Sequence, residues 1–125
     1  MTDEERAEQG IRTRREVLGN AHVDRAIAKT TDFTSPFQDF ITRYAWGDIW
    51  SRPGLSRPER SMITLTALAV LRQDEELAMH VSAALRNGLS VSQIQEVLLQ
   101  VAVYAGVPAA NRAFAIAADV LEHAT

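Results

Sequence analysis

The chain contains no cysteine and only one lysine, Lys29. The missing cysteines exclude disulfides, thiolate nucleophiles and zinc–cysteine sites. The sequence also lacks a glycine-rich phosphate loop, a lysine motif typical of Schiff-base enzymes, and a second histidine at a metal-ligand spacing. We therefore expect that the protein works without a cofactor and without a bound metal.

Strong charge of one sign and long hydrophobic runs are also missing. The net charge of the 125 residues is −3, which argues against nucleic acid and against an anionic membrane surface as partners. The apolar run 62–71 is too short to cross a bilayer, and the acidic N-terminus does not have the pattern of a signal peptide. We expect one globular, cytoplasmic domain over residues 1–125, with no nucleic-acid or membrane partner.

Helical periodicity runs through the whole chain, and no segment has the strict alternation of a strand. The sequence therefore predicts an all-α fold, a single-domain helical bundle. We expect helices over about 3–18, 22–30, 35–46, 57–72, 75–86, 91–105 and 108–123, and a tryptophan-containing loop over 47–53.

Several helix starts are marked by capping residues. Ser35, Ser56 and Ser90 are each followed three residues later by Gln or Glu, which is the pattern of a capping box. Asp74 is expected to cap the next helix, which should end at the Asn87-Gly88 pair.

Two of the expected helices are apolar on nearly every side. The run 62–71 carries one polar residue type, threonine, and the helix 91–105 adds Leu99 and Val103 outside its main apolar stripe. A helix that is apolar all round must be covered all round, and a chain of this length has few layers with which to do so twice. We expect a homo-oligomer; a monomer with one central helix is the alternative.

A possible catalytic pair lies in the helix that begins near residue 75. Glu76 and His80 are one helical turn apart, and at 100° per residue His80 falls at the edge of the apolar stripe, half sheltered, between Ala84 and Glu76. The carboxylate should favour the protonated imidazole, which could then donate a proton near neutral pH. A weak surface pair with no catalytic role is the alternative.

Arg60 is the first candidate for substrate binding. It lies near the start of a helix, where a cation opposes the helix dipole, so a role in anchoring an anion would explain it. An ion pair with Glu59 or with a neighbouring subunit would explain it equally well. Trp46, Trp50 and Tyr104 could line a pocket, although aromatic residues near loops are more often part of a core or an interface.

Motifs distributed over nearly the whole chain resemble the gamma-carboxymuconolactone decarboxylase family of the alkyl hydroperoxidase-like superfamily. The most specific is the run Trp-Gly-Asp-Ile-Trp-Ser-Arg-Pro-Gly-Leu at 46–55, which is typical of the decarboxylase branch. The others are Val-Leu-Gly at 17–19, Glu-Arg-Ser at 59–61, Glu-Leu-Ala-Met-His at 76–80, Ala-Leu-Arg-Asn-Gly at 84–88, Glu-Val-Leu-Leu-Gln at 96–100 and Tyr-Ala-Gly-Val-Pro at 104–108.

The resemblance implies an all-helical fold that assembles as a homotrimer or homohexamer. The peroxidase branch uses two cysteines, seven and four residues before a shared histidine, and a glutamate that serves them. Those three positions correspond to Gln73, Glu76 and Ser61 here, ahead of His80, so the resemblance does not carry peroxidase activity to this chain.

The implied reaction is decarboxylation of 4-carboxymuconolactone, a small dicarboxylate lactone, to 3-oxoadipate enol-lactone in protocatechuate breakdown by the beta-ketoadipate pathway. His80 with Glu76 would supply the proton and Arg60 would bind a carboxylate or the lactone oxygen; the reverse roles of Glu76 and His80 stay open. Two alternatives remain, which are a related enzyme acting on another lactone or beta-keto acid, and a non-catalytic helical module.

Overall fold

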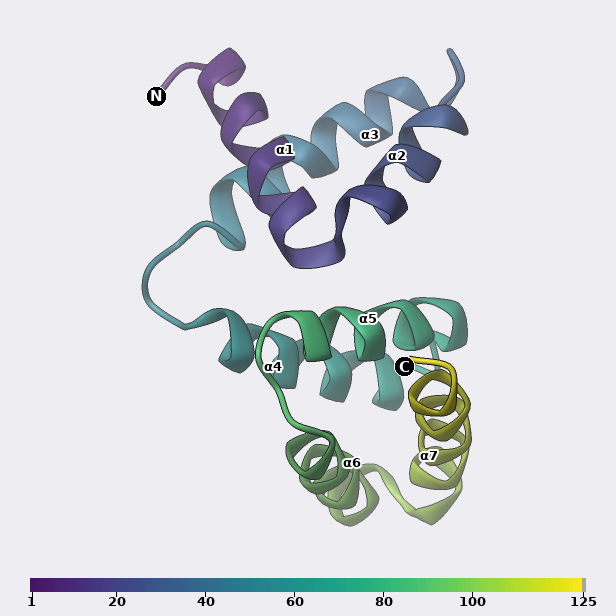
Figure 1. Cartoon of the computed structure of the whole chain (residues 1–125). Helices are drawn as coiled ribbons and strands as arrows, with labels where there is room; N and C mark the ends of the chain where they lie inside the picture. The colour runs from purple at the N-terminus through teal and green to yellow at the C-terminus, as the bar shows by residue number, and fades with distance from the viewer. Residues whose placement is uncertain (125) are drawn as a thin grey trace. The chain divides into compact units, whose positions relative to one another are not determined.

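Helices, and no strands, make up the regular secondary structure of residues 1–124, the part of the chain that the computed structural model describes (Figure 1). The predicted all-α class is therefore confirmed. The chain divides into two compact units, Met1–Leu55 and the residues from Ser56 onward, and the prediction of one functional domain stays a prediction. The elements are α1 (Asp3–Leu18), α2 (Asn20–Ala28), α3 (Ser35–Ile41), the π-helix η1 (Thr42–Ile49), α4 (Arg57–Val70), α5 (Asp74–Arg86), α6 (Val91–Ala105) and α7 (Val107–Glu122).

Two of the three predicted serine caps are confirmed. The Ser56 and Ser90 hydroxyls each accept a hydrogen bond from the backbone N–H three residues on. In turn, the side-chain oxygens of Glu59 and Gln93 accept a hydrogen bond from the backbone N–H of the serine. The prediction for Ser35 is wrong, because this residue already lies inside α3 and Thr34 occupies the cap position without capping the helix.

The start of α5 also differs from the prediction. Asp74 is the first residue of the helix and not its cap, which is Gln73. The reason is a competing partner: the Asp74 carboxylate accepts a hydrogen bond from Arg112 Nε of α7, at 2.7 Å. This bond ties the start of α5 to the side of α7.

The Asp74–Arg112 bond makes the stability of the fold depend on pH. The hydrogen bond from Arg112 lowers the pKa of Asp74 below its ordinary value, so the bond stabilises the folded state above that ordinary value and is lost as the pH falls through the lowered pKa. We expect Asp74→Asn to lower the Tm slightly at pH 7 and not at all in strong acid. Glu75→Gln changes an exposed neighbour of Asp74 and should leave the Tm unchanged at either pH. Equal effects of the two variants on the Tm in a thermal melt would contradict the predicted role of the Asp74–Arg112 bond.

The first unit is held together by a close crossing of α1 and η1. A Cβ on Gly10 would lie 2.0 Å from the carbonyl oxygen of Thr42, and a Cβ on Gly47 would lie 2.7 Å from that of Arg6. Any larger residue at either position would push the two helices apart. Gly47 is therefore a contact residue and does not end the helix.

The predicted tryptophan-containing loop over 47–53 is therefore wrong for residues 47–49, whereas residues 50–53 do lie outside the helices. The chain stays helical through Gly47 to Ile49, with Trp46 inside η1 and Trp50 as its C-terminal cap. Trp46 is buried and stacks on Trp50 with ring centroids 5.3 Å apart. Ser51 reinforces this end of η1, because its hydroxyl donates to the carbonyl of Trp46 at 2.7 Å.

The second unit consists of two helical pairs, α4 with α5 and α6 with α7 (Figure 1). α4 also contacts α6, and α5 contacts α7, so the four helices surround one apolar core. The most deeply buried side chains of this core are Leu65, Leu77, Val81, Ala84, Ile94, Leu98, Val101 and Ala113.

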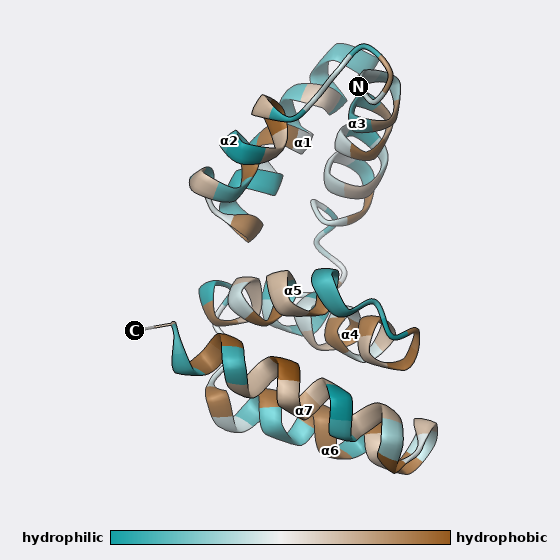
Figure 2. Cartoon of the chain, turned by 90° about the vertical axis from the view of Figure 1, so that its right-hand side faces the viewer, coloured by the Kyte–Doolittle hydropathy of each residue, from teal (hydrophilic) through white to brown (hydrophobic). Residues whose placement is uncertain are grey.

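Helices α4 and α6 carry many apolar residues, which are brown in Figure 2, and several of these side chains are exposed. Ile63 is 58% exposed, Val103 75% and Tyr104 84%. The predicted all-round apolar character of both helices thus leaves an apolar surface that the other helices of the second unit do not cover. Within the described residues, no helix is both long enough and apolar enough to cross a membrane.

Candidate functional site

The candidate site begins with one side of α5. Glu76, His80 and Asn87 follow a nearly straight line along this helix, since residues four and seven apart recur on the same side. Asn87 Nδ2 donates to the hydroxyl of Ser61 on α4 at 3.0 Å. This side of α5 therefore faces the first turn and a half of α4, and we call the line where the two helices meet the α4–α5 seam, defined by Arg60, Ser61, His80 and Asn87.

His80 is more sheltered than the sequence predicts. Its exposed fraction is 9%, which makes it one of the few buried polar residues of the described chain. The prediction of a half-sheltered edge position is therefore wrong. The helical wheel counts only the residues of α5, whereas the small neighbours Ala83 and Ala84, both buried, let other helices cover the same side.

Glu76 lies one turn from His80 on the same helix and is exposed. The structure thus places a carboxylate in water one helical turn from an imidazole that is largely removed from water. An imidazole in such a position can pass a proton between a sheltered substrate and solvent, because the carboxylate beside it can assist its reprotonation.

Arg60 is half-buried on α4, directly before Ser61. Because Ser61 contacts Asn87, and Asn87 lies seven residues beyond His80, Arg60 is displaced from His80 by about 10 Å along the helix axes. A long arginine side chain and a small substrate together can span that separation. The structure thus brings three of the predicted site residues, His80, Glu76 and Arg60, to one hairpin.

The three aromatic residues predicted to line a pocket do not join this group within the second unit. Trp46 belongs to the first unit, where it is buried against Trp50. Tyr104 lies on the outer side of α6 and is largely exposed. Its hydroxyl borders a groove on the surface, and it has no place in the α4–α5 seam.

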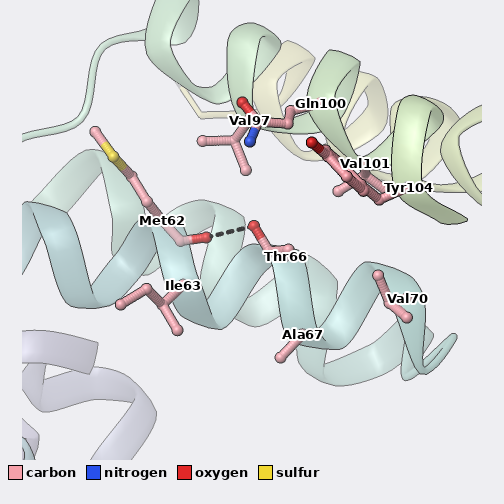
Figure 3. A pocket seen from close by; sticks show the side chains of 9 residues that line it. All are labelled: Met62, Ile63, Thr66, Ala67, Val70, Val97, Gln100, Val101 and Tyr104. Atoms are coloured by element: carbon pink, nitrogen blue, oxygen red, sulfur yellow. Dashed lines mark hydrogen bonds between the residues drawn. The ribbon is translucent and has the colours of Figure 1, made fainter.

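That groove has a volume of about 540 Å³. Figure 3 shows side chains of α4 and α6 converging on it. No charged side chain lines it, and the hydroxyl of Thr66 already donates to the carbonyl of Met62 at 2.9 Å. A dicarboxylate would find no cation in this groove. Its lining residues are Met62, Ile63, Thr66, Ala67, Val70, Val97, Gln100, Val101 and Tyr104.

The Ser61–Asn87 hydrogen bond is a feature that the sequence did not reveal. Asn87 has the pattern of a helix stop and Ser61 is one polar residue in an apolar helix, so neither suggests a contact across 26 residues. Ser61 is only 2% exposed. A lone serine at a core position, with an amide residue at the end of the next helix, is the signal that could have indicated it.

One cluster of possible metal ligands occurs in the described residues. Asp119, Glu122 and His123 bring ligand atoms within 4.8 Å of one another at the end of α7. All three are exposed, and His123 Nδ1 lies 2.8 Å from the carbonyl oxygen of Asp119. Exposed acidic groups of this kind are common without an ion, so the cluster does not support a metal-dependent site.

The fold and the residues of the α4–α5 seam together indicate a general class of protein. A four-helix core whose second helix carries a sheltered histidine one turn after a carboxylate, in a chain without cysteine, is an all-α protein suited to acid–base chemistry and not to thiol chemistry. Residues 35–119 match the model of the carboxymuconolactone decarboxylase family. The chain belongs to this family.

Three curated relatives are informative. The 4-carboxymuconolactone decarboxylase of Acinetobacter baylyi is 44% identical over 122 residues, which is 98% of this chain and 91% of the relative. The nitrosuccinic acid decarboxylase npaB of Metarhizium robertsii is 39% identical over 109 residues, 87% of this chain and 76% of the relative. A 4-carboxymuconolactone decarboxylase sequence of Pseudomonas putida is 50% identical over 48 residues, 38% of this chain and all of that relative.

Proposed function

We propose that this protein is a carboxy-lyase that converts 4-carboxymuconolactone to 3-oxoadipate enol-lactone and carbon dioxide without a cofactor. The observation that carries the proposal is the 44% identity to a 4-carboxymuconolactone decarboxylase over 98% of the chain. The pathway would be the breakdown of protocatechuate through beta-ketoadipate, and the compartment the cytoplasm.

The chemistry of this substrate suits a chain without an electron-accepting cofactor. The departing carboxylate is attached to a carbon allylic to a double bond, which is conjugated with the lactone carbonyl. When the carbon–carboxylate bond breaks, its electron pair spreads to the carbonyl oxygen as a dienolate. A proton then adds to the carbon next to that carbonyl. The protein must therefore stabilise an oxyanion, bind two carboxylates and deliver one proton.

The α4–α5 seam offers groups for these tasks. His80 donates or relays the proton, supported by Glu76, whose exposed carboxylate exchanges protons with water. Arg60 binds a carboxylate or the lactone oxygen, since a guanidinium can hold a carboxylate through two parallel hydrogen bonds. Trp46 and Tyr104 remain proposed binding residues on weaker grounds, because one is buried against Trp50 and the other lies at the apolar groove.

The nitrosuccinic acid decarboxylase relative favours a second candidate substrate. In nitrosuccinic acid the nitro group and one carboxylate share a carbon, so loss of that carboxylate leaves electrons that the nitro group accepts as a nitronate. Both molecules are therefore dicarboxylates with a built-in electron sink. The same proton donor and carboxylate anchor would serve either reaction.

The substrate assay is the direct test. The purified protein, dialysed and supplied with a chelator, should release carbon dioxide from 4-carboxymuconolactone at a far higher kcat/KM than from nitrosuccinic acid. In heavy water the enol-lactone product should carry one solvent deuterium on the carbon next to the carbonyl. Preference for nitrosuccinic acid would establish the second candidate. Activity that the chelator removes and zinc or manganese restores would contradict the cofactor-free reaction.

Arg60 gives a second test of the seam. Arg60→Ala should raise KM about 10- to 100-fold if the guanidinium anchors a carboxylate, because a hydrogen bond to a charged group contributes about 1.5–3 kcal/mol. A lower kcat with unchanged KM would indicate contact with the oxyanion instead. Arg60→Lys keeps the charge but not the bidentate geometry, so it should recover only part of the loss. The exposed Arg12→Ala is the matched control; unchanged kinetics of Arg60→Ala would make Arg60 structural.

We also propose that the protein assembles as a homotrimer or homohexamer. Support comes from the apolar groove together with the exposed side chains of α4 and α6 around it. Monomeric proteins rarely expose contiguous apolar patches larger than a few hundred Å². A second copy of the chain is the occupant that the lack of lining charge favours, and the subunit count is taken from the family resemblance.

A further inference from the structure

A basic pocket within the first unit is unused by the proposed reaction. It has a volume of about 360 Å³ and is lined by His22, Arg25, Lys29 and Gln38, together with Ala26, Thr30 and Thr34. We propose that this pocket binds a small organic dianion, either a dicarboxylate or a phosphate ester. All of its lining residues belong to the first unit, whereas His80, Glu76 and Arg60 belong to the second.

The pocket presents donors and positive charge but no carboxylate. Its lining includes two permanent cations, Arg25 and Lys29, and no Asp or Glu. Asp24, which directly precedes Arg25, is held by Arg15 Nη1 at 2.9 Å. A pocket with this imbalance is electrostatically complementary to an anion.

Arg14 does not line the pocket but holds one of its lining residues, Gln38, in place. Its Nη1 donates to Gln38 Oε1 at 3.2 Å, which fixes the amide and leaves the two N–H donors of Gln38 Nε2 for another acceptor. Arg14 is only 7% exposed, and its Nε has no hydrogen-bond partner among the described residues. A buried arginine with an unsatisfied nitrogen is costly, and an anion beside Gln38 would reduce that cost by balancing the charge.

The positive charges in and around the pocket affect the pKa of His22. Burial is the largest cause that lowers the pKa of His22, and the charges of Arg14, Arg25 and Lys29 lower it further. His22 is therefore a reporter within the pocket itself. A bound dianion would offset the three positive charges, so the titration midpoint of His22 should rise when the pocket is filled.

The spacing of the cations suits a ligand with two negative charges. His22, Arg25 and Lys29 are three and four residues apart along α2, on one side of the helix. Arg25 and Lys29 are thus separated by about 6 Å along the axis. That separation suits a dicarboxylate or a phosphate ester of a few carbon atoms, whose two negative charges both cations can meet.

The test measures binding and the reporter together. The full chain is titrated calorimetrically with adipate, glycerol 2-phosphate, inorganic phosphate and acetate at equal ionic strength, and its three histidines are followed by NMR. We expect adipate or glycerol 2-phosphate to bind at least tenfold more tightly than acetate and to raise the midpoint of His22 but not of His123. The tighter of the two identifies the ligand as dicarboxylate or phosphate ester.

Variants separate a built site from general surface charge. Arg25→Gln and Lys29→Gln should each weaken binding about tenfold or more, as expected for loss of one charge-assisted hydrogen bond. Arg12→Gln removes an exposed cation of α1 outside the pocket and should change nothing. Equal weakening by all three variants, an unmoved His22 midpoint, or affinities no better than that of acetate would overturn the proposal.

Discussion

Replacing His80 by alanine should lower kcat for 4-carboxymuconolactone by about 10²–10⁴-fold, the usual contribution of a positioned general acid or base. The exposed fraction of His80 is 9%, so water cannot readily replace the imidazole as proton donor at the reacting carbon. The effect should lie mainly in kcat, because proton delivery takes place after the substrate has bound. Steady-state kinetics on the assembled variant measure it.

The burial of His80 provides a sharp control. His80→Ala leaves a space the size of an imidazole, so added imidazole should restore part of the activity of this variant and none in His80→Gln, where the side chain fills the space. His123→Ala removes an exposed histidine and should keep full activity. Full activity in a folded, assembled His80→Ala would mean that the proton comes from another group.

A charge placed in the apolar groove should dissociate the oligomer. The unaltered protein should sediment at several times its 13.8 kDa mass, as a trimer or hexamer. Ala67 is exposed in the chain and lines the groove, so Ala67→Glu should fold normally yet place an unpaired carboxylate in the interface. Such a charge costs about 2–5 kcal/mol, which corresponds to a weakening of at least ~30-fold per interface.

Sedimentation velocity at several micromolar protein tests this directly. Ser92→Glu is the matched control, since Ser92 is exposed in the first turn of α6 and does not line the groove. It should leave the oligomer intact. A monomeric unaltered protein would contradict the proposed assembly. Equal sedimentation of the two variants would mean that a surface other than the groove joins the subunits.

Local signals in the sequence predicted the helices well. Ser56 and Ser90 act as the caps that their spacing to Glu59 and Gln93 predicts, because a capping box depends only on residues within one turn. The ends of α5 and α6 likewise follow from Gly88 and Gly106, which both have positive φ. Such features need no knowledge of distant contacts.

Contacts between helices explain the wrong predictions. Glycine often marks the end of a helix, but at Gly47 the missing side chain instead lets η1 approach the carbonyl of Arg6 on α1. Asp74 has the pattern of a cap, but Arg112 on α7 competes for its carboxylate. In each case the partner lies about 40 residues away along the chain, where spacing rules have no information.

The sequence predicts residues for the candidate site, which stay predictions, but it does not predict their environment. The spacing of Glu76 and His80 placed them one turn apart, whereas the burial of His80 depends on which helices cover that side of α5. The position of Arg60 beside the seam depends on the Ser61–Asn87 hydrogen bond. Tyr104 was expected at a substrate pocket and lies instead at an apolar groove without cations.

The most direct measurement compares kcat of His80→Ala with kcat of Glu76→Gln, in the same buffer and at the same subunit count. His80 as the proton donor predicts that His80→Ala loses more activity, because Glu76→Gln removes only the group that charges and orients the imidazole. A larger loss in Glu76→Gln would make the carboxyl group the acid and reverse the roles. Full activity in both variants would place the reaction away from the α4–α5 seam.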